Sequence, residues 1–372
     1  MSNHCRTVRV CFIAPKAYPL FNPETTGVIG GIEVDFYNLS TELAKDKAFE
    51  VSFITADYGQ ADVQQIKGVR VVKSLRYDSS ALVGALKLWK AMQQCNADIY
   101  FQEGTSAGTY LVGLFCKLRG KTFVYRSAHR NDCDGTYLQQ HPVNGRLFRS
   151  ALRHAAKVIV QNRSDQYEML RTVGVASVVI PNAHHLSEVT KACRWRILWV
   201  GRSADYKRPE LFIDLARYFP DEKFTMICQK ATGDERYDEL KSQAATIENL
   251  QFIQRVPYQE IDSYFCQAKL FVCTSRGEGF PNTYVQACKN ATPIVSLSVN
   301  PDNFLNEYRC GLCAEGDWDK FVRQVKQMLD PATSRQYGRN ARSYAEQKHD
   351  IKRIIEVYKG LFRELVNRKD VR

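Results

Sequence analysis

Hydrophobic and polar positions along the chain follow two alternating periods. Short apolar runs with the composition of β-strands are separated by longer stretches in which apolar residues recur at helical spacing. This alternation predicts βαβ units and therefore an α/β fold built on parallel sheets. The predicted strands are 8–14, 51–55, 69–72, 99–102, 122–127, 158–161 and 178–181, followed by 197–200, 224–227, 250–252, 270–273 and 293–296.

The helical pattern is clearest at 31–44, 146–156, 164–172 and in the closing stretch 351–366. The regular alternation breaks at 184–188, a polar stretch without periodicity that we interpret as an interdomain linker.

A length of 372 residues suits two domains at about 150 residues each. We expect two doubly wound, Rossmann-like domains, 1–185 and 186–350, with the C-terminal helix 351–372 rejoining the first. In this architecture ligands bind beyond the carboxyl ends of the strands, here in a cleft between the domains.

Charge narrows the classes of partner. The chain has 52 Lys and Arg against 40 Asp and Glu, a net charge of +12, which favours phosphate-bearing substrates, nucleic acid or an anionic membrane surface. No apolar run approaches the roughly 18 residues of a spanning helix, and the first residues lack the apolar core of a signal peptide. A cytoplasmic location is therefore expected, with peripheral contact at the inner face of the membrane as an option.

The 12 cysteines do not indicate a metal site. Several lie inside apolar runs, as small core residues do, and the one CxxC, Cys310 to Cys313, has no second CxxC or nearby histidines. We predict no bound metal.

Basic residues cluster between 135 and 164, where no acidic residue occurs. Arg149, Arg153 and Lys157 recur every four residues, which predicts that they share one helix face. This face is either a solvated surface or a footprint for anionic lipid headgroups. A core helix is favoured over lipid contact for four large apolar residues: Leu86, Leu88, Trp89 and Met92.

Two motifs in the second predicted domain carry candidate chemistry. After the strand 197–200, Gly201 makes a turn and the cations Arg202 and Lys207 flank a loop that opens a helix. Cations beside a helix N-terminus at a strand's carboxyl end form a good diphosphate site, although each could instead be a solvated surface charge.

The second motif, SRGEGFPNTYVQA at 275–287, follows the strand 270–273. Gly277 and Gly279 let the backbone approach a ligand closely, and the helix after Pro281 presents free N–H groups. Glu278 is well placed to bind hydroxyl groups. The alternative is an ordinary solvated turn carrying one acid.

With these residues the chain resembles the family 4 glycosyltransferases of the GT-B fold, which are retaining and independent of metal. The resemblance covers nearly the whole chain and rests on four segments in the family's order: Gly30-Gly31-Ile32-Glu33, Val179-Ile180-Pro181-Asn182, Gly201-Arg202 with Lys207, and Glu278 to Thr283.

One position departs from the family pattern. The second glutamate of the paired-glutamate motif, which typically holds the nucleotide ribose, is Gln286 here. An amide can still hydrogen-bond a diol, but without the charge. His129 follows the strand 122–127, where the family often has a histidine facing the donor sugar. It is either that active-site histidine or a structural residue of the loop.

The resemblance implies a set of site residues. Catalytic candidates are Glu278, Arg202, Lys207 and His129, and donor-binding candidates are Gly30, Gly31, Gly201, Gly279, Phe280, Pro281, Asn282, Thr283 and Gln286.

It also implies the activity: transfer of a sugar from a UDP- or GDP-linked donor to a hydroxyl of a glycan or lipid-linked glycan, in surface polysaccharide or glycolipid synthesis. The nucleotide sugar is a substrate, so no cofactor is expected. The alternatives are a sugar-nucleotide epimerase of the same fold and a non-catalytic partner subunit, the latter kept open by Gln286. No nucleic-acid recognition motif is present.

Overall fold

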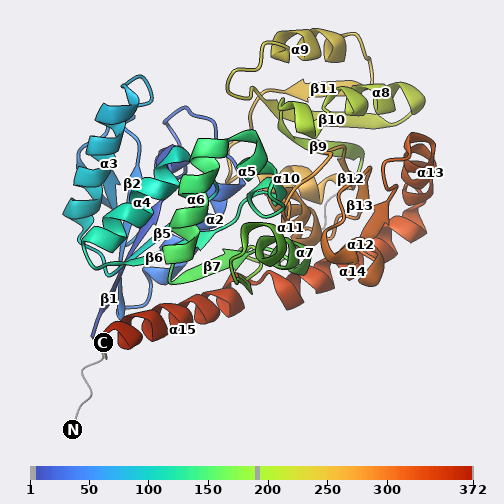
Figure 1. The fold of residues 1–372 in the computed structure, drawn as a ribbon. Coiled ribbons are helices and arrows are strands. Elements are labelled where there is room, and N and C mark those ends of the chain that lie inside the picture. Colours follow the sequence, from blue (N-terminus) through green and yellow to red (C-terminus); the bar gives the residue numbers. More distant parts are fainter. Residues whose placement is uncertain (1–5, 189–192, 371–372) are drawn as a thin grey trace. The chain divides into compact units, whose positions relative to one another are not determined.

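The structure is a computed structural model that describes residues 6–188 and 193–370 of the chain. The chain divides into two compact units (Figure 1). Unit 1 comprises Met1–His185 and Ile351–Arg372, and unit 2 comprises Leu186–Asp350. Among the described helices, none combines the length and the apolar character needed to cross a membrane.

Unit 1 is built on an eight-stranded sheet with the order β3-β4-β2-β1-β5-β6-β7-β8. All neighbours pair in parallel except β3 and β4, which are antiparallel. The strands are β1 (Val8–Ile13), β2 (Phe49–Thr55), β3 (Val63–Ile66), β4 (Val69–Lys73), β5 (Ile99–Glu103), β6 (Thr122–Arg126), β7 (Lys157–Val160) and β8 (Val178–Val179).

The helices of unit 1 cover both faces of this sheet. They are α1 (Tyr18–Phe21), α2 (Gly31–Leu43), α3 (Ala81–Cys95), α4 (Ala107–Leu118), α5 (Thr136–Gln140), α6 (Pro142–His154), α7 (Arg163–Glu168) and α15 (Ile351–Asp370). The chain moves in one direction from β1 to β2 and in the other from β5 to β6, so right-handed crossovers place α2 and α4 on opposite faces. Figure 1 shows α3, α4 and α6 side by side, whereas α15 packs on α2.

Unit 2 repeats this design on a six-stranded parallel sheet with the order β11-β10-β9-β12-β13-β14. Its strands are β9 (Arg196–Arg202), β10 (Lys223–Gln229), β11 (Leu250–Ile253), β12 (Ala268–Cys273), β13 (Ile294–Ser296) and β14 (Gly311–Cys313). Its helices are α8 (Glu210–Tyr218), α9 (Tyr237–Ala245), α10 (Ile261–Cys266), α11 (Asn282–Lys289), α12 (Phe304–Glu307), α13 (Trp318–Met328) and α14 (Pro331–Lys348).

The strands predicted from apolar runs are all present, because strands covered by helices on both faces are apolar throughout. Two strands were not predicted. The exposed antiparallel edge strand β3 lacks an apolar run, and the three-residue β14 is too short to give a pattern. Cys310 and Cys313 are buried free thiols, as expected of core residues.

The prediction of a three-cation helix face is wrong at Lys157. Helix α6 ends at His154, and Ala155 has extended backbone angles (φ −68°, ψ 134°), so Lys157 begins β7 instead. Arg149 and Arg153 remain on α6, and the Arg149 Nε donates a hydrogen bond to the Val173 carbonyl (2.8 Å).

The prediction of a core helix at 86–92 is correct for Leu88 and Met92, which are buried, and wrong for Leu86, which is 63% exposed.

Candidate functional site

The candidate residues of unit 2 lie where the winding of its sheet reverses. From β9 the chain moves outward through α8 to β10, whereas from β12 it moves the opposite way through α11 to β13. Since β9 and β12 are neighbours, the loops that follow them diverge at the carboxyl edge of the sheet. This is the position where open α/β sheets bind ligands.

The two loops are fixed to each other by hydrogen bonds. The Arg276 backbone N–H donates to the Tyr206 carbonyl (2.8 Å), and the Thr274 hydroxyl donates to the Lys207 carbonyl (2.6 Å). The same hydroxyl accepts from the Trp199 indole N–H (3.0 Å), which connects both loops to the core of β9. The motif around Lys207 is therefore rigidly positioned relative to the loop that carries Glu278.

Arg208 strengthens this connection and was not predicted. Its backbone has a left-handed conformation (φ 48°), and its guanidinium donates to the Thr274 carbonyl (2.7 Å) and the Ser298 hydroxyl (2.9 Å). Burial lowers the pKa of Arg208. Its place in the sequence, directly after Lys207 and before Pro209, gives no sign of this role because its partners lie more than sixty residues away.

Lys207 and Glu278 form an ion pair between the two loops, with side chains 16% and 10% exposed. Burial by itself disfavours the Lys207 ammonium, but the carboxylate of Glu278 outweighs it and raises the pKa of Lys207. The pair therefore presents a fixed cation and a fixed hydroxyl acceptor at the carboxyl edge of the sheet.

Arg202 and Gly201 end strand β9 beside this pair. The Arg202 guanidinium donates to the Tyr206 hydroxyl (3.4 Å) and is partly exposed. Packing explains why position 201 is a glycine, because a Cβ there would lie 2.7 Å from the Trp199 ring. Glycine at 201 thus lets the large Trp199 side chain pack within the sheet.

The loop after Glu278 leads into α11, which begins at Asn282 with Pro281 as its N-cap. Pro281 has no side-chain acceptor for the first turn, where Asn282 and Thr283 lie partly exposed. The neighbouring Gly279 is buried. The amides of this turn are suited to an anion or a hydroxyl oxygen.

Three predicted donor-binding residues have buried side chains, namely Phe280, Pro281 and Gln286. The Phe280 ring packs in the core of unit 2 against Phe304 (5.0 Å between centroids) and His349 (4.9 Å), so its backbone is what remains for a ligand. Gln286 lies in the second turn of α11 and is 7% exposed.

In unit 1 the glycine pair opens helix α2. Gly30 is the N-cap, its N–H donates to the Glu33 carboxylate (2.8 Å), and Gly31 is exposed. A Cβ on Gly30 would lie 3.1 Å from that carboxylate, so the small residue allows the cap to form. The turn follows β1, at the reversal point of the unit 1 sheet between β1 and β5.

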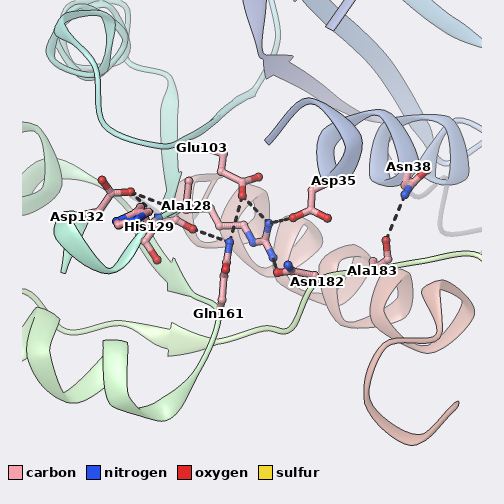
Figure 2. Close-up of polar contacts among 11 residues, drawn as sticks. Asp35, Asn38, Glu103, Ala128, His129, Asp132, Gln161, Asn182 and Ala183 are labelled. Atoms are coloured by element: carbon pink, nitrogen blue, oxygen red, sulfur yellow. Dashed lines mark hydrogen bonds and ion pairs between the residues drawn. The ribbon is translucent and has the colours of Figure 1, made fainter. Parts of the chain in front are cut away.

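His129 lies after β6 on the same edge. Its Nδ1 accepts from the Asn131 N–H (3.1 Å). The nearby Asp132 is buried, and its Oδ2 accepts from the N–H groups of Ala128 (2.8 Å) and His129 (3.2 Å), as Figure 2 shows. Asp132 thus holds the shape of the loop that carries His129.

A fully buried cluster around Arg126, which the sequence did not reveal, stands beside this loop (Figure 2). Arg126 Nη1 contacts the carboxylates of Asp35 and Glu103, each at 2.8 Å, and Nη2 donates to Asn182 Oδ1 (2.7 Å). Gln161 Nε2 donates to Glu103 Oε1 (3.4 Å).

The cluster holds two carboxylates for one guanidinium. Burial raises the pKa of Glu103 well above its usual range, because Asp35 adds to the cost of desolvation and Arg126 only partly offsets it. These residues connect α2, β5, β6 and the segment before the second unit, so the cluster fixes the edge that carries Gly30 and His129.

No group of three or more His, Cys, Asp or Glu residues suited to a metal ion occurs within 6–188 and 193–370.

Two family models match the chain. The model for "Glycosyl transferases group 1" matches residues 187–344, and the model for "Glycosyltransferase Family 4" matches residues 29–188. Together they cover both units, in the order and at the positions of the motifs described above. The chain is a family 4 glycosyltransferase of the GT-B fold.

Relatives agree with this family. The O-antigen biosynthesis glycosyltransferase WbnH of Escherichia coli is 24% identical over 360 residues, covering 92% of this chain and 97% of its own. The probable O-antigen biosynthesis glycosyltransferase WbiN of Escherichia coli gives the same values.

Solved glycosyltransferases share the fold. Sucrose-phosphate synthase from Thermosynechococcus elongatus superimposes with a TM-score of 0.79 at 16% identity, covering 96% of this chain and 99% of its own. A mutant of TarM of S. aureus, solved in complex with fondaparinux, alpha-GlcNAc-glycerol and UDP, gives a TM-score of 0.76 at 11% identity, covering 95% and 99%.

Proposed function

We propose that this glycosyltransferase is retaining and transfers a sugar from a nucleotide-diphosphate sugar to a hydroxyl of a glycan or lipid-linked glycan, in surface polysaccharide or glycolipid synthesis. The observation that carries the proposal is the partly buried Lys207–Glu278 ion pair at the reversal point of the unit 2 sheet. The O-antigen relatives support the pathway class, and the neighbour solved with UDP makes UDP the first donor to test.

In this proposal the cations of unit 2 neutralise the leaving diphosphate. Lys207 and Arg202 contact the phosphates, and the first amides of α11 at Asn282 and Thr283 add hydrogen-bond donors. Glu278 accepts hydrogen bonds from donor sugar hydroxyls, and Gln286 hydrogen-bonds the ribose. By analogy with oxyanion stabilisation, loss of one such cation raises the barrier by about 2.7–4 kcal/mol, a factor of about 10²–10³ in rate.

The chemistry proceeds on one face of the sugar. The bond between the anomeric carbon and the phosphate oxygen breaks, the acceptor oxygen bonds to the same face, and the departing phosphate oxygen takes the acceptor proton. No metal and no protein nucleophile takes part in this scheme. The family resemblance assigns His129 and the Gly30-Gly31 turn of unit 1 to the donor as well.

A thermal-shift panel with UDP and GDP tests the donor site. A nucleotide at about 100 times its Kd stabilises the fold by about 2.7 kcal/mol. We expect one nucleotide to raise the melting temperature equally with and without EDTA. Lys207→Ala abolishes the shift, whereas Lys269→Ala retains it, since Lys269 forms a comparable ion pair with Glu222 elsewhere in unit 2.

The result that overturns the proposal is equally clear. If neither nucleotide binds the folded protein, or if the two lysine variants lose binding equally, Lys207 is not part of a donor site. The non-catalytic partner subunit, which Gln286 had kept open, then becomes the better interpretation. If nucleotide binds, transfer to lipid-linked glycan acceptors with retention at the anomeric carbon completes the test.

We also propose that unit 1 makes peripheral contact with the inner face of an anionic membrane. Helices α3, α4, α5 and α6 contain no Asp or Glu. They carry six Lys and Arg residues: Lys87, Lys90, Lys117, Arg146, Arg149 and Arg153. Large apolar side chains beside them are exposed, namely Leu82 (72%), Leu86 (63%) and Val143 (72%). Cations near such a surface contribute about 1 kcal/mol each.

Vesicle co-sedimentation tests this contact. We expect the protein to bind vesicles that contain phosphatidylglycerol and not vesicles of pure phosphatidylcholine. This binding should weaken as the salt concentration rises and in the double variant Arg146→Gln/Arg153→Gln. Equal binding to both vesicle types, or none to either, contradicts the membrane contact and leaves the donor-site proposal intact.

A further inference from the structure

The loop after β6 holds the His129 side chain in one tautomer. Residues Arg130–Asp132 form a single 3-10 turn, and His129 is its N-cap. The backbone N–H of Asn131 donates to the His129 Nδ1 (3.1 Å), so this nitrogen is an acceptor. Since a neutral imidazole has one protonated and one unprotonated nitrogen, the proton is on Nε2. In this tautomer Nε2 is a hydrogen-bond donor and has no lone pair with which to accept a proton.

Asp132 fixes the backbone of this turn. The residue is buried, and its Oδ2 accepts from the N–H groups of Ala128 (2.8 Å) and His129 (3.2 Å), as Figure 2 shows. Its own N–H donates to the His129 carbonyl (3.0 Å). Three hydrogen bonds within one turn leave the backbone little freedom. The Asn131 N–H therefore keeps its direction toward the imidazole.

Two hydroxyl groups connect Asp132 to the sheet behind the turn. Thr105 follows β5 and donates its hydroxyl hydrogen bond to the Asp132 Oδ1 (2.7 Å). Tyr125 is buried in β6, and its hydroxyl lies 3.1 Å from that of Thr105. Because the Thr105 proton points to the carboxylate, the Tyr125 hydroxyl is the donor of this second hydrogen bond. Burial and the Asp132 carboxylate both raise the pKa of Tyr125, which keeps its hydroxyl protonated for this role.

We infer that this hydroxyl–carboxylate chain positions His129 so that its Nε2–H donates a hydrogen bond to an oxygen of the donor sugar. Its members Tyr125, Thr105 and Asp132 are positioning residues, and His129 is a hydrogen-bond donor rather than a base. The hydroxyl groups add orientation, because the carboxylate alone would already close the turn. A side chain that must meet one sugar oxygen needs such support, since productive geometry tolerates only about 0.5 Å of misplacement. The role toward the sugar rests on the proposed function, whereas the tautomer follows from the loop.

Long-range ¹H–¹⁵N correlation spectra of the histidine side chains at pH 8 measure the tautomer. The variant His129→Asn identifies the signals of His129 among the seven histidines. We expect the Nε2–H tautomer in the wild type. Thr105→Val removes the hydroxyl at nearly constant volume and should give a mixture of both tautomers. Thr105→Ser keeps the hydroxyl and should keep the wild-type pattern.

Calorimetry measures whether the orientation of His129 serves the sugar. The probes are UDP-glucose, UDP-N-acetylglucosamine and GDP-mannose, each compared with its free nucleotide on the same variant. Thr105→Val should raise the Kd of the nucleotide sugar about threefold to tenfold, the value of one hydrogen bond, and leave the Kd of the nucleotide within about twofold. The matched control Thr333→Val on α14 removes a similar hydroxyl–carboxylate hydrogen bond, to Asp330 (2.8 Å), and should change neither Kd.

The outcomes separate this inference from the donor-site proposal. If the wild type holds His129 as Nδ1–H, or if Thr105→Val leaves the tautomer or the ratio of the two Kd values unchanged, the inference is overturned and the Lys207 site stands. If no nucleotide or nucleotide sugar binds the wild type, the proposed function fails and the role toward the sugar fails with it. Should Thr105→Val not fold, Tyr125→Phe keeps the buried ring, removes the first donor of the chain and is judged by the same two measurements.

Discussion

The buried charge at Arg126 gives the sharpest prediction about stability. Replacing Arg126 by methionine keeps much of the side-chain volume but removes the cation that Asp35 and Glu103 share at 2.8 Å. All three side chains are about 1% exposed, so water cannot solvate the negative charge that remains on the Asp35 and Glu103 carboxyl groups. Removing one partner of a buried ion pair costs about 3–5 kcal/mol. In a unit of about 200 residues this lowers the melting temperature by about 6–20 °C.

Urea and thermal unfolding at pH 7, followed by circular dichroism, measure this loss. The control is the triple variant Arg126→Met/Asp35→Asn/Glu103→Gln, which removes all three ionisable groups together. Neutral replacements of similar volume often cost little, so the triple variant should recover most of the lost stability.

Two results would refute the reasoning. If Arg126→Met unfolds within about 1 kcal/mol of the wild type, the guanidinium does not compensate the carboxylates. If the triple variant is as unstable as the single variant, the loss comes from packing and not from unpaired charge.

Three further predictions follow from single residues. Because burial raises the pKa of Glu103, the folded chain keeps a proton that the unfolded chain releases above about pH 4.3, so the contribution of Glu103 to stability falls as pH rises. The urea midpoint of Glu103→Gln should therefore increase relative to that of the wild type from pH 5 to 9. A constant difference between the two midpoints over this range would contradict the prediction. Gly338→Ala should destabilise the protein, because the new Cβ on α14 would overlap the Ala291 carbonyl oxygen. Gly360→Ala on α15 places its Cβ in open space, so this control should stabilise the protein by about 0.5–1 kcal/mol in the same unfolding assay. Gln286→Glu should tighten UDP binding several-fold by calorimetry, because charge-assisted hydrogen bonds to a diol are about twice as strong; an unchanged Kd argues against ribose contact.

The sequence could predict the strands and the motifs of unit 2 because both are local. Strands of a covered parallel sheet are apolar runs, and the residues from Gly201 to Lys207 and from Glu278 to Thr283 are contiguous. Each motif lies directly after a predicted strand, so its place at the carboxyl edge follows from the fold class.

The Arg126 cluster could not be predicted for the opposite reason. Its partners Asp35, Asn182 and Glu103 lie 91, 56 and 23 residues away, and nothing local marks them as a set. The single available signal was a charged residue at the end of an apolar run.

The error at Lys157 has a different cause. A four-residue spacing continues across the end of α6, and the chain leaves the helix at Ala155 without a glycine or proline to mark it.

The ion pair between Lys207 and Glu278 affects which ligand the proposed donor site prefers. In the folded chain each charge neutralises the other, which lowers the cost of burying both in unit 2. A diphosphate that approaches Lys207 competes with Glu278 for the same ammonium group. The carboxylate released by that competition is then available to accept hydrogen bonds from sugar hydroxyls. A donor that carries both groups replaces the whole pair, whereas a nucleotide without a sugar leaves Glu278 with an unmet charge. On this proposal, the Lys207–Glu278 pair favours binding of the complete nucleotide sugar over binding of the nucleotide alone.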